Sequence, residues 1–79
     1  MDKKTAITDY IKNEVIHNRN APINEADDLI SAGIIDSLGI LQLVAFISDS
    51  FGIEVPDEDV VYENFHSIEA ISNYLQKYS

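Results

Sequence analysis

Apolar residues recur at helical spacing in three stretches of the chain. In residues 2–17 they fall at Ile7, Ile11 and Val15, and most of the positions between them are polar or charged. Similar series follow positions 36 and 67. Their apolar members are Ile40, Leu43, Val44, Ile47 and Phe51 in the first series, and Ile68, Ile71, Leu75 and Tyr78 in the second. The pattern predicts helices over about residues 2–17, 37–50 and 68–77, with these stripes facing a common core.

Capping residues stand where the apolar series begin and end. Asp36 and Ser67 are side chains that favour the N-cap, and Gly52 is typical of a C-cap. Pro22 cannot continue the first helix, so we expect that helix to fray around residues 18–20, which include Arg19. Lys77 and Glu69 have charges that complement the dipole at the two ends of the last helix.

The segments between the helices carry their own apolar anchors. Residues 20–35 form a long loop, which we expect to be ordered, with a short turn at 27–29 and an unusual backbone conformation at Gly33. Its expected anchors are Ile23, Leu29, Ile30, Ile34 and Ile35. After an extended stretch at 53–55, we expect a short turn of helix at 57–61 and a short helix at 62–65 with Phe65 inward. The predicted fold class is all-α: a small antiparallel bundle of three main helices plus one short helix, in a single domain spanning residues 1–79.

Length and hydropathy limit what the chain can be. With 79 residues and 46% hydrophobic composition, it can bury one modest core. No apolar run is long enough to span a membrane, and residues 1–5 lack the apolar segment of a signal peptide. We therefore expect a cytoplasmic monomer that does not insert into membranes.

The charge distribution narrows the choice of partners. The net charge is −9, and residues 20–76 contain eleven acids but no Lys or Arg. Nucleic acid and anionic membrane surfaces are disfavoured as partners, because binding either requires positive charge. We expect partner proteins with basic patches, although the acidity alone would also keep a small protein soluble. The absence of cysteine excludes a Cys nucleophile, so any thiol would have to come from a prosthetic group.

The start of the second helix is the most distinctive candidate site. If Asp36 is the N-cap, Ser37 is the first helical residue, and its hydroxyl faces unpaired N–H groups at the positive end of a helix dipole. Such a position favours a phosphate group. The tripeptide Asp36-Ser37-Leu38 by itself is also consistent with an ordinary helix cap.

Other candidate chemistry is weaker. His17 and His66 are the only two histidines, and the chain has no Gly-x-Ser-x-Gly turn. We expect both histidines to be surface or capping residues. The run at 57–59 lacks the ligand spacing of an EF-hand loop, so we expect a solvated acidic turn and no metal site.

The run Gly33-Ile34-Ile35-Asp36-Ser37-Leu38, with Phe51-Gly52-Ile53 and Val55-Pro56 after it, resembles the acyl carrier protein family. The resemblance extends from about residue 28 to 75. It implies that a phosphopantetheinyl transferase moves 4'-phosphopantetheine from coenzyme A onto Ser37, and that the arm carries acyl or aminoacyl thioesters to partner enzymes. It further implies that Asp36 contacts the transferase or its metal and that Leu38 belongs to the docking surface. Such a chain is a carrier and not itself an enzyme.

Two features depart from the pattern of fatty-acid carriers. Gly39 stands where many of them have an acid, at a helix-propensity cost of about 1 kcal/mol relative to Ala. It would either allow close approach of a partner or of the arm, or be neutral. The helix predicted over residues 37–50 is also poor in Glu. We therefore expect partners to dock through Leu38, Leu41 and Gln42, with Asp49 contributing less.

The pathway stays open at this point. Fatty acid synthesis, polyketide or nonribosomal peptide assembly, and transfer of an activated amino acid to a cell-surface polymer all use such carriers. The apolar docking helix favours a dedicated assembly pathway over fatty acid synthesis. A non-carrier acidic helical interaction module, with Ser37 only a cap, is the alternative of a different class.

Overall fold

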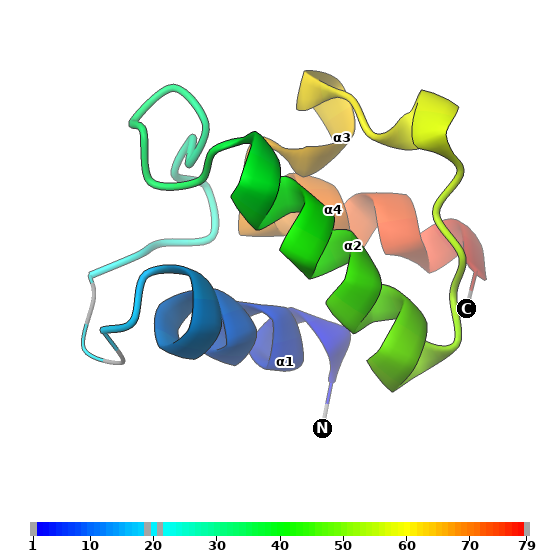
Figure 1. Ribbon diagram of the computed structural model, residues 1–79, viewed down its shortest axis with the longest axis horizontal. Coiled ribbons are helices and arrows are strands. Elements are labelled where there is room, and N and C mark those ends of the chain that lie inside the picture. Colours follow the sequence, from blue (N-terminus) through cyan, green and yellow to red (C-terminus); the bar gives the residue numbers. More distant parts are fainter. Residues whose placement is uncertain (1, 19, 21, 79) are drawn as a thin grey trace.

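Three helices provide most of the buried side chains. In a computed structural model, which describes residues 2–18, 20 and 22–78, these are α1 (Lys3–Tyr10), α2 (Ser37–Phe51) and α4 (Ile68–Leu75). The short α3 (Tyr62–Phe65) precedes α4. α1 runs antiparallel to α2 and α4, and a long loop leads from the end of α1 to the start of α2 (Figure 1). The expected all-α class is confirmed.

The first helix changes its winding partway along. Asp2 caps α1, since its Oδ1 accepts from the Thr5 N–H at 2.9 Å. From Ile11 to Val15 the chain continues as a π-helix, η1, closed by a bond from the Ile16 N–H to the Ile11 carbonyl at 2.8 Å. His17 then adopts a left-handed φ of 62°. The expected helix over about residues 2–17 is therefore confirmed from Lys3 to Val15, but beyond Tyr10 it winds as a π-helix. Arg19 lies outside the described residues.

The core contains side chains from all four helices and from the loop. Its fully buried large members are Phe65, Ile7, Ile11, Leu29, Leu43, Ile47, Ile68, Ile71 and Leu75. Phe65 therefore points inward as expected, while Phe51 is only half-buried against this cluster. At the C-terminal end the prediction fails, because Tyr78 is 40% exposed and Tyr74 is buried instead. The last turn, η3 (Gln76–Tyr78), is a 3₁₀-helix, whose tighter winding rotates Tyr78 off the buried stripe.

The loop before α2 is ordered by few anchors. Leu29 and Ile35 are buried, and Ile23 and Ile30 are half-buried, but Ile34 is 37% exposed. The N–H groups of both Ile34 and Ile35 bond to the Leu29 carbonyl, so the chain turns here and only one of the two neighbouring side chains reaches the core. The expectation for Ile34 is wrong. Gly33 has the positive φ expected of it, 75°.

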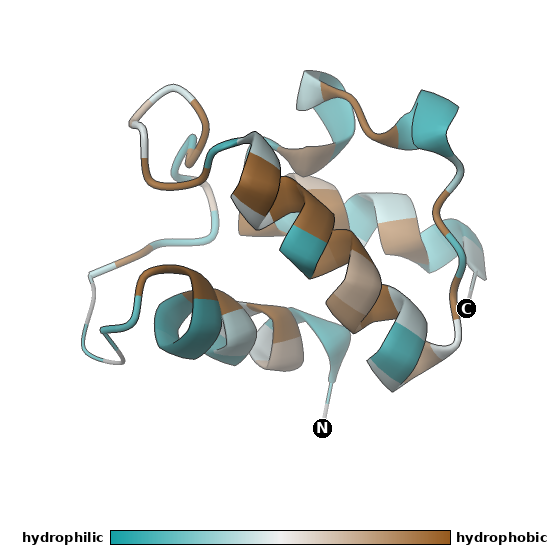
Figure 2. Ribbon diagram, in the orientation of Figure 1, coloured by the Kyte–Doolittle hydropathy of each residue, from teal (hydrophilic) through white to brown (hydrophobic). Residues whose placement is uncertain are grey.

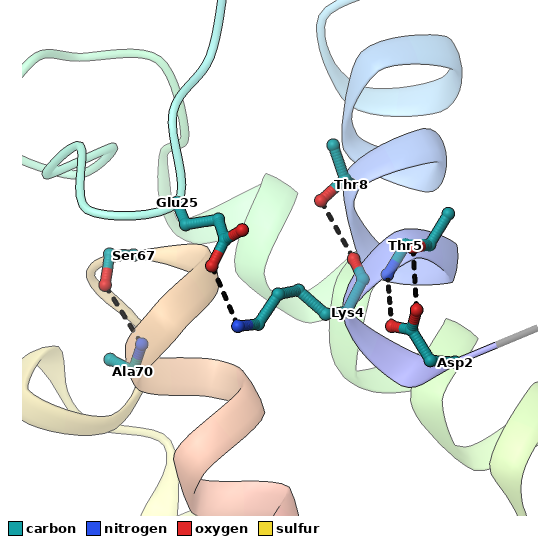
Figure 3. Close-up of polar contacts among 7 residues, drawn as sticks. All are labelled: Asp2, Lys4, Thr5, Thr8, Glu25, Ser67 and Ala70. Atoms are coloured by element: carbon teal, nitrogen blue, oxygen red, sulfur yellow. Dashed lines mark hydrogen bonds and ion pairs between the residues drawn. The ribbon is translucent and has the colours of Figure 1, made fainter.

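Polar contacts fasten the same loop to the helices on either side. Lys4 of α1 forms an ion pair with Glu25 at 2.8 Å, and the Glu25 carbonyl accepts from the Glu69 N–H of α4 at 3.0 Å. Figure 3 shows Glu25 between α1 and the start of α4, close to the Ser67 cap. The Leu29 N–H donates to the His66 carbonyl at 2.7 Å. These bonds fix the loop that leads into α2.

Hydrophobic residues are not confined to the inside of the bundle. In Figure 2 much of α2 is coloured as hydrophobic, including residues on the side turned towards the viewer. Within the described ranges, no helix is long and apolar enough to cross a membrane.

Candidate functional site

Asp36 determines where α2 begins. Its backbone is extended, with φ −108° and ψ −172°, and its carbonyl accepts the first helical bond, from the Ile40 N–H at 3.0 Å. The side-chain Oδ1 accepts from the Gly39 N–H at 2.9 Å, which satisfies one of the free amides of the first turn. Asp36 is thus the N-cap predicted from the sequence, and α2 starts at Ser37.

Ser37 is presented outward by this cap. Its side chain is exposed, and within the described part of the chain its Oγ makes no hydrogen bond. The hydroxyl lies beside the backbone N–H groups of the first helical turn, where the dipole of the 15-residue α2 favours an anion. The residues present therefore fit a phosphodiester on Ser37: the oxygen is accessible, and the helix end stabilises the charge.

Gly39 lies in a tight packing contact inside the molecule. It is buried, and a Cβ at this position would lie 3.0 Å from Ile35 Cγ2 and 3.2 Å from Val15 Cγ1. The first turn of α2 thus comes close to the π-helical end of the first helix. This internal contact explains why residue 39 is a glycine. The close approach of a partner or of the arm, which the sequence suggested, is not needed to explain it.

The outer surface of α2 carries large apolar side chains near the start of the helix. Leu38 and Leu41 are each 63% exposed, and Gln42 and Asp49 are also exposed. All four expected docking residues are therefore accessible. Beside them a hollow lies between α2 and residues 54–57, and its walls include Leu41, Val44, Val55 and Pro56.

A second hollow adjoins Ser37 and was not foreseen. Asp36 and Leu38, the two neighbours of Ser37, line it together with Glu14, Val15, His17, Gly33, Ile34, Gly39 and Gln42. These residues come from two separated segments, 14–17 and 33–42, that only the fold brings together. Apart from the unusual backbone expected at Gly33, no local pattern in the sequence indicates such a hollow.

The histidines have different surroundings. His17 is exposed at the rim of this second hollow. His66 is half-buried and stacks on Tyr62, with ring centroids 5.0 Å apart, and its Nδ1 is buried without a hydrogen-bond partner in the described chain. The Tyr62 hydroxyl donates to Asp28, whose pKa is lowered first by the backbone N–H of Ser31 and then by this hydroxyl. This small cluster joins the loop to α3.

The acidic run forms a 3₁₀ turn, η2 (Asp57–Asp59). Asp57 and Glu58 are exposed, as expected of a solvated turn, but Asp59 accepts from the Tyr74 hydroxyl at 2.6 Å and lies 3.5 Å from Lys77 Nζ. The expectation was wrong for Asp59, because tertiary contacts give it partners. Within the ranges the structure describes, no three side chains of His, Cys, Asp or Glu are grouped as a metal would require.

Comparison with known proteins gives a consistent result. A family model described as a phosphopantetheine attachment site matches residues 8–75. An acyl carrier protein of Syntrophobacter fumaroxidans is 32% identical over 71 residues, covering 90% of this chain and 84% of that protein. One from Bdellovibrio bacteriovorus is 38% identical over 42 residues, covering 53% of this chain and 51% of that protein.

A similar fold is found among solved structures. A chain in a structure titled "Crystal structure of FAD-dependent dehydrogenase" matches with a TM-score of 0.78 at 22% identity. The match covers 86% of this chain and 96% of that chain. At this identity the likeness establishes the shared fold.

Proposed function

Since the chain belongs to the acyl carrier protein family, whose covalent prosthetic group is 4'-phosphopantetheine, we propose that Ser37 is the residue that carries this group. One observation supports the assignment above all others: Ser37 is the exposed first residue of α2, directly after the Asp36 cap. Ser67 also begins a helix, but it is only 2% exposed. Accessibility and the helix dipole together favour Ser37.

Attachment requires a second protein. In the described chain no side chain hydrogen-bonds to the Ser37 Oγ, so nothing held against it prepares it as a nucleophile. A phosphopantetheinyl transferase supplies the activation: a bond forms between Oγ and a phosphorus of coenzyme A, and the bond from that phosphorus to the nucleotide part breaks. Asp36 uses Oδ1 for its cap, which leaves Oδ2 available to the transferase or its metal. The chain acts here as a substrate.

The role of the loaded protein is to position a tethered substrate. The arm ends in a thiol, and an acyl or aminoacyl group is held on it as a thioester. Tethering keeps that group at high effective concentration near the active site of each partner that docks. Loading and processing enzymes with apolar or basic docking patches are the proposed partners, and residues 1–79 act as one domain.

Intact-mass measurement tests the assignment. Incubation with coenzyme A and a broad-specificity phosphopantetheinyl transferase is expected to add one phosphopantetheine to the wild-type chain and none to Ser37→Ala. Circular dichroism of Ser37→Ala should match that of the wild type, because the exposed hydroxyl has no hydrogen-bond partner among the residues that the structure describes. Labelling that persists in Ser37→Ala would refute the assignment. A wild-type chain that gains no mass would favour the acidic interaction module.

The docking surface is proposed to be the exposed side of α2. Leu38 and Leu41 are large apolar side chains in contact with water, which is typical of an interaction site. Gln42 lies beside them, and Asp49 is the only acid within α2. A partner would therefore gain most from burying the leucines and less from the charge.

A salt series separates these two contributions. Transfer of an acyl group from a loading enzyme should be weakened more by Leu41→Ala than by Asp49→Asn, and moderate salt should reduce affinity only slightly. A mainly apolar interface favours a dedicated assembly pathway, such as polyketide or nonribosomal peptide synthesis or aminoacyl transfer to a cell-surface polymer. If affinity depended steeply on salt and Asp49→Asn weakened transfer more than Leu41→Ala, fatty acid synthesis would become the favoured pathway.

A further inference from the structure

The hollow between α2 and residues 54–57 has one wall on the helix that Ser37 begins and one wall outside it. The helix wall includes Leu41, Val44 and Ser48. These follow Ser37 by four, seven and eleven positions, so at 100° per residue they lie on the same flank of α2 as Ser37. We name this space the docking hollow, because a protein that reaches Ser37 along this flank passes it.

The chemistry of the docking hollow indicates what could enter it. Leu41 is 63% exposed, and Val55 and Pro56 add apolar surface on the opposite wall. Glu54 and Asp57 stand at the two ends of that segment, and both are exposed. The ion pairs found among the described residues do not involve these two carboxylates. The hollow therefore fits a segment of a partner protein that brings one apolar side chain with a Lys or Arg next to it.

Asp59 fastens the segment that forms the second wall. Its N–H donates to the Pro56 carbonyl at 2.9 Å and closes the η2 turn. Its carbonyl accepts from the Asn64 side chain of α3 at 2.9 Å, and its Oδ2 accepts from the Tyr74 hydroxyl of α4 at 2.6 Å. One residue thus ties the wall to two helices. In Figure 1 the segment after α2 runs back beside that helix, and the C-terminal end of α4 lies close to it.

Tyr74 is a firm anchor for Asp59. It is 8% exposed, and its ring packs against Phe65 in the core, with the ring centroids 5.8 Å apart. The Tyr78 hydroxyl lies 3.2 Å from the Tyr74 hydroxyl, and Lys77 Nζ lies 4.5 Å from the centroid of the Tyr74 ring. A buried tyrosine hydroxyl needs a hydrogen-bond partner, which Asp59 supplies. The place of Asp59 is therefore set from the core.

The turn that Asp59 closes is short and exposed. Pro56 and Asp57 are both exposed, so burial in the core does not fix them. Their carbonyls accept from the Asp59 and Val60 N–H groups, at 2.9 and 3.1 Å. These bonds belong to a single turn of 3₁₀-helix, whose hydrogen-bond geometry is poorer than that of an α-helix. The turn therefore relies on the tertiary contacts of Asp59 to keep its place.

We propose that Tyr74 is a positioning residue for partner docking. Through Asp59 it keeps Pro56 and Asp57 in place as the wall opposite Leu41. A partner's apolar side chain then enters the docking hollow with a cation beside Asp57. This inference rests on the docking surface proposed above for α2. It gives the buried end of α4 a part in recognition, although Tyr74 does not itself line the hollow.

Steady-state transfer of phosphopantetheine tests the proposal, with the carrier as the varied substrate and the broad-specificity transferase as the partner. Tyr74→Phe removes only the hydroxyl and keeps the ring against Phe65. It is expected to raise the KM for the carrier severalfold and to leave kcat unchanged, because Ser37 and its cap are untouched. The control is Ile71→Val, which loosens the core from the same helix but leaves the bond to Asp59. At a temperature where circular dichroism shows both variants folded, the KM of Ile71→Val should equal that of the wild type.

A double-mutant cycle with Asp57→Asn provides the second readout. In the wild-type background this change should raise the KM at low salt, because the partner's cation loses its carboxylate. In the Tyr74→Phe background the same change should have less effect, since Asp57 is no longer held where that cation meets it. Additive effects of the two changes, or a KM that rises as much in Ile71→Val as in Tyr74→Phe, would overturn the proposal. Either result is what a merely structural role of Tyr74 predicts.

Leu41→Ala separates a failure of this inference from a failure of the proposed function. If Leu41→Ala raises the KM and Tyr74→Phe does not, the positioning role is overturned and the docking surface stands. If Leu41→Ala leaves the KM unchanged, the docking surface on α2 is overturned, and the positioning role with it.

Discussion

The starts of α2 and α4 are both capped by a side-chain oxygen, but the two caps differ in their exposure. At α2 the Asp36 Oδ1 accepts from the N–H three residues later at 2.9 Å, and at α4 the Ser67 Oγ accepts from the Ala70 N–H at 3.0 Å. Ser67 is buried, whereas Asp36 and the following Ser37 are exposed. A capping motif therefore says where a helix begins. Whether that helix end is accessible to a ligand depends on whether other parts of the fold bury it.

The two starts also differ in how they are held. α4 is fixed from outside its own first turn, by the bond from the Glu69 N–H to the Glu25 carbonyl and by the burial of Ser67. α2 is held by close packing at Gly39, which lets its first turn approach Val15 and Ile35. The start of α2 thus remains open because it is supported on its inner side, by close packing at a residue without a side chain.

Filling that contact should produce the largest loss of stability. Gly39→Val is expected to lower the free energy of unfolding by about 1–3 kcal/mol, because the added atoms overlap with Val15 and Ile35. Ala45→Val, at an exposed position of the same helix, controls for the helix propensity of valine. Urea denaturation of both variants measures the difference. If Gly39→Val were as stable as the control, the close approach of α2 to the first helix would not constrain residue 39.

Removing either capping side chain should lower the stability less than filling the contact at Gly39. Ser67→Ala is expected to cost about 1 kcal/mol through the lost cap while leaving transfer of phosphopantetheine complete. Asp36→Ala should cost a similar amount or less, because this cap is exposed, yet it should also slow transfer. Thermal unfolding and timed mass spectra separate the two properties. Slower modification of Ser67→Ala than of Asp36→Ala would contradict the division between a structural and a functional cap.

The smallest expected effect is a pH dependence of the stability, and it comes from the pair formed by Tyr74 of α4 and Asp59. Burial and the bond to Asp59 raise the pKa of Tyr74, and the same bond lowers the pKa of Asp59. The pair is therefore favoured with Asp59 ionised and Tyr74 neutral. Its stabilisation is present above the ordinary carboxyl pKa of about 4 and is lost as the pH falls through the lowered pKa of Asp59. It is lost again as the pH rises past the ordinary tyrosine pKa of about 10 towards the raised value.

Tyr74→Phe isolates this contribution. The difference in melting temperature between wild type and Tyr74→Phe should be largest from about pH 5 to 9 and should shrink at both extremes. Tyr62→Phe, which removes the hydroxyl bound to Asp28, is a matched comparison on the loop side. A difference that stays constant from acid to alkaline pH would show that the Tyr74 hydroxyl is not coupled to Asp59.

Much of the fold and the centre of the site could be predicted without coordinates. The limits of α2 follow from Asp36 and Gly52, and Gly52 indeed has the left-handed φ of 68°. Phe65 and the Ser67 cap were also correctly placed, and the family match agrees with the motif around Ser37. These features are local, because a cap, a stripe or a turn involves residues within one or two helical turns of each other.

Errors arose where an irregular local backbone or a neighbour distant in sequence decided the outcome. Ile34 and Tyr78 are exposed although their spacing suggested burial, and Asp59 is bonded although its composition suggested solvation. Whether Gly39 served a partner or the fold depended on Val15, which is 24 positions away in the chain. The π-helical winding after Tyr10 likewise left no trace in the apolar periodicity.

The sequence by itself therefore determined the helices, their caps and the serine that the family motif marks, since short-range hydrogen bonds and periodic burial encode all three. Only the tertiary structure decided which cap stayed open, why residue 39 is a glycine, and that Val15, Gly33 and Ile34 line one hollow beside Ser37. The physical reason is that exposure and close packing are properties of surfaces brought together from separate segments. No single stretch of residues contains the information about which surfaces will face each other.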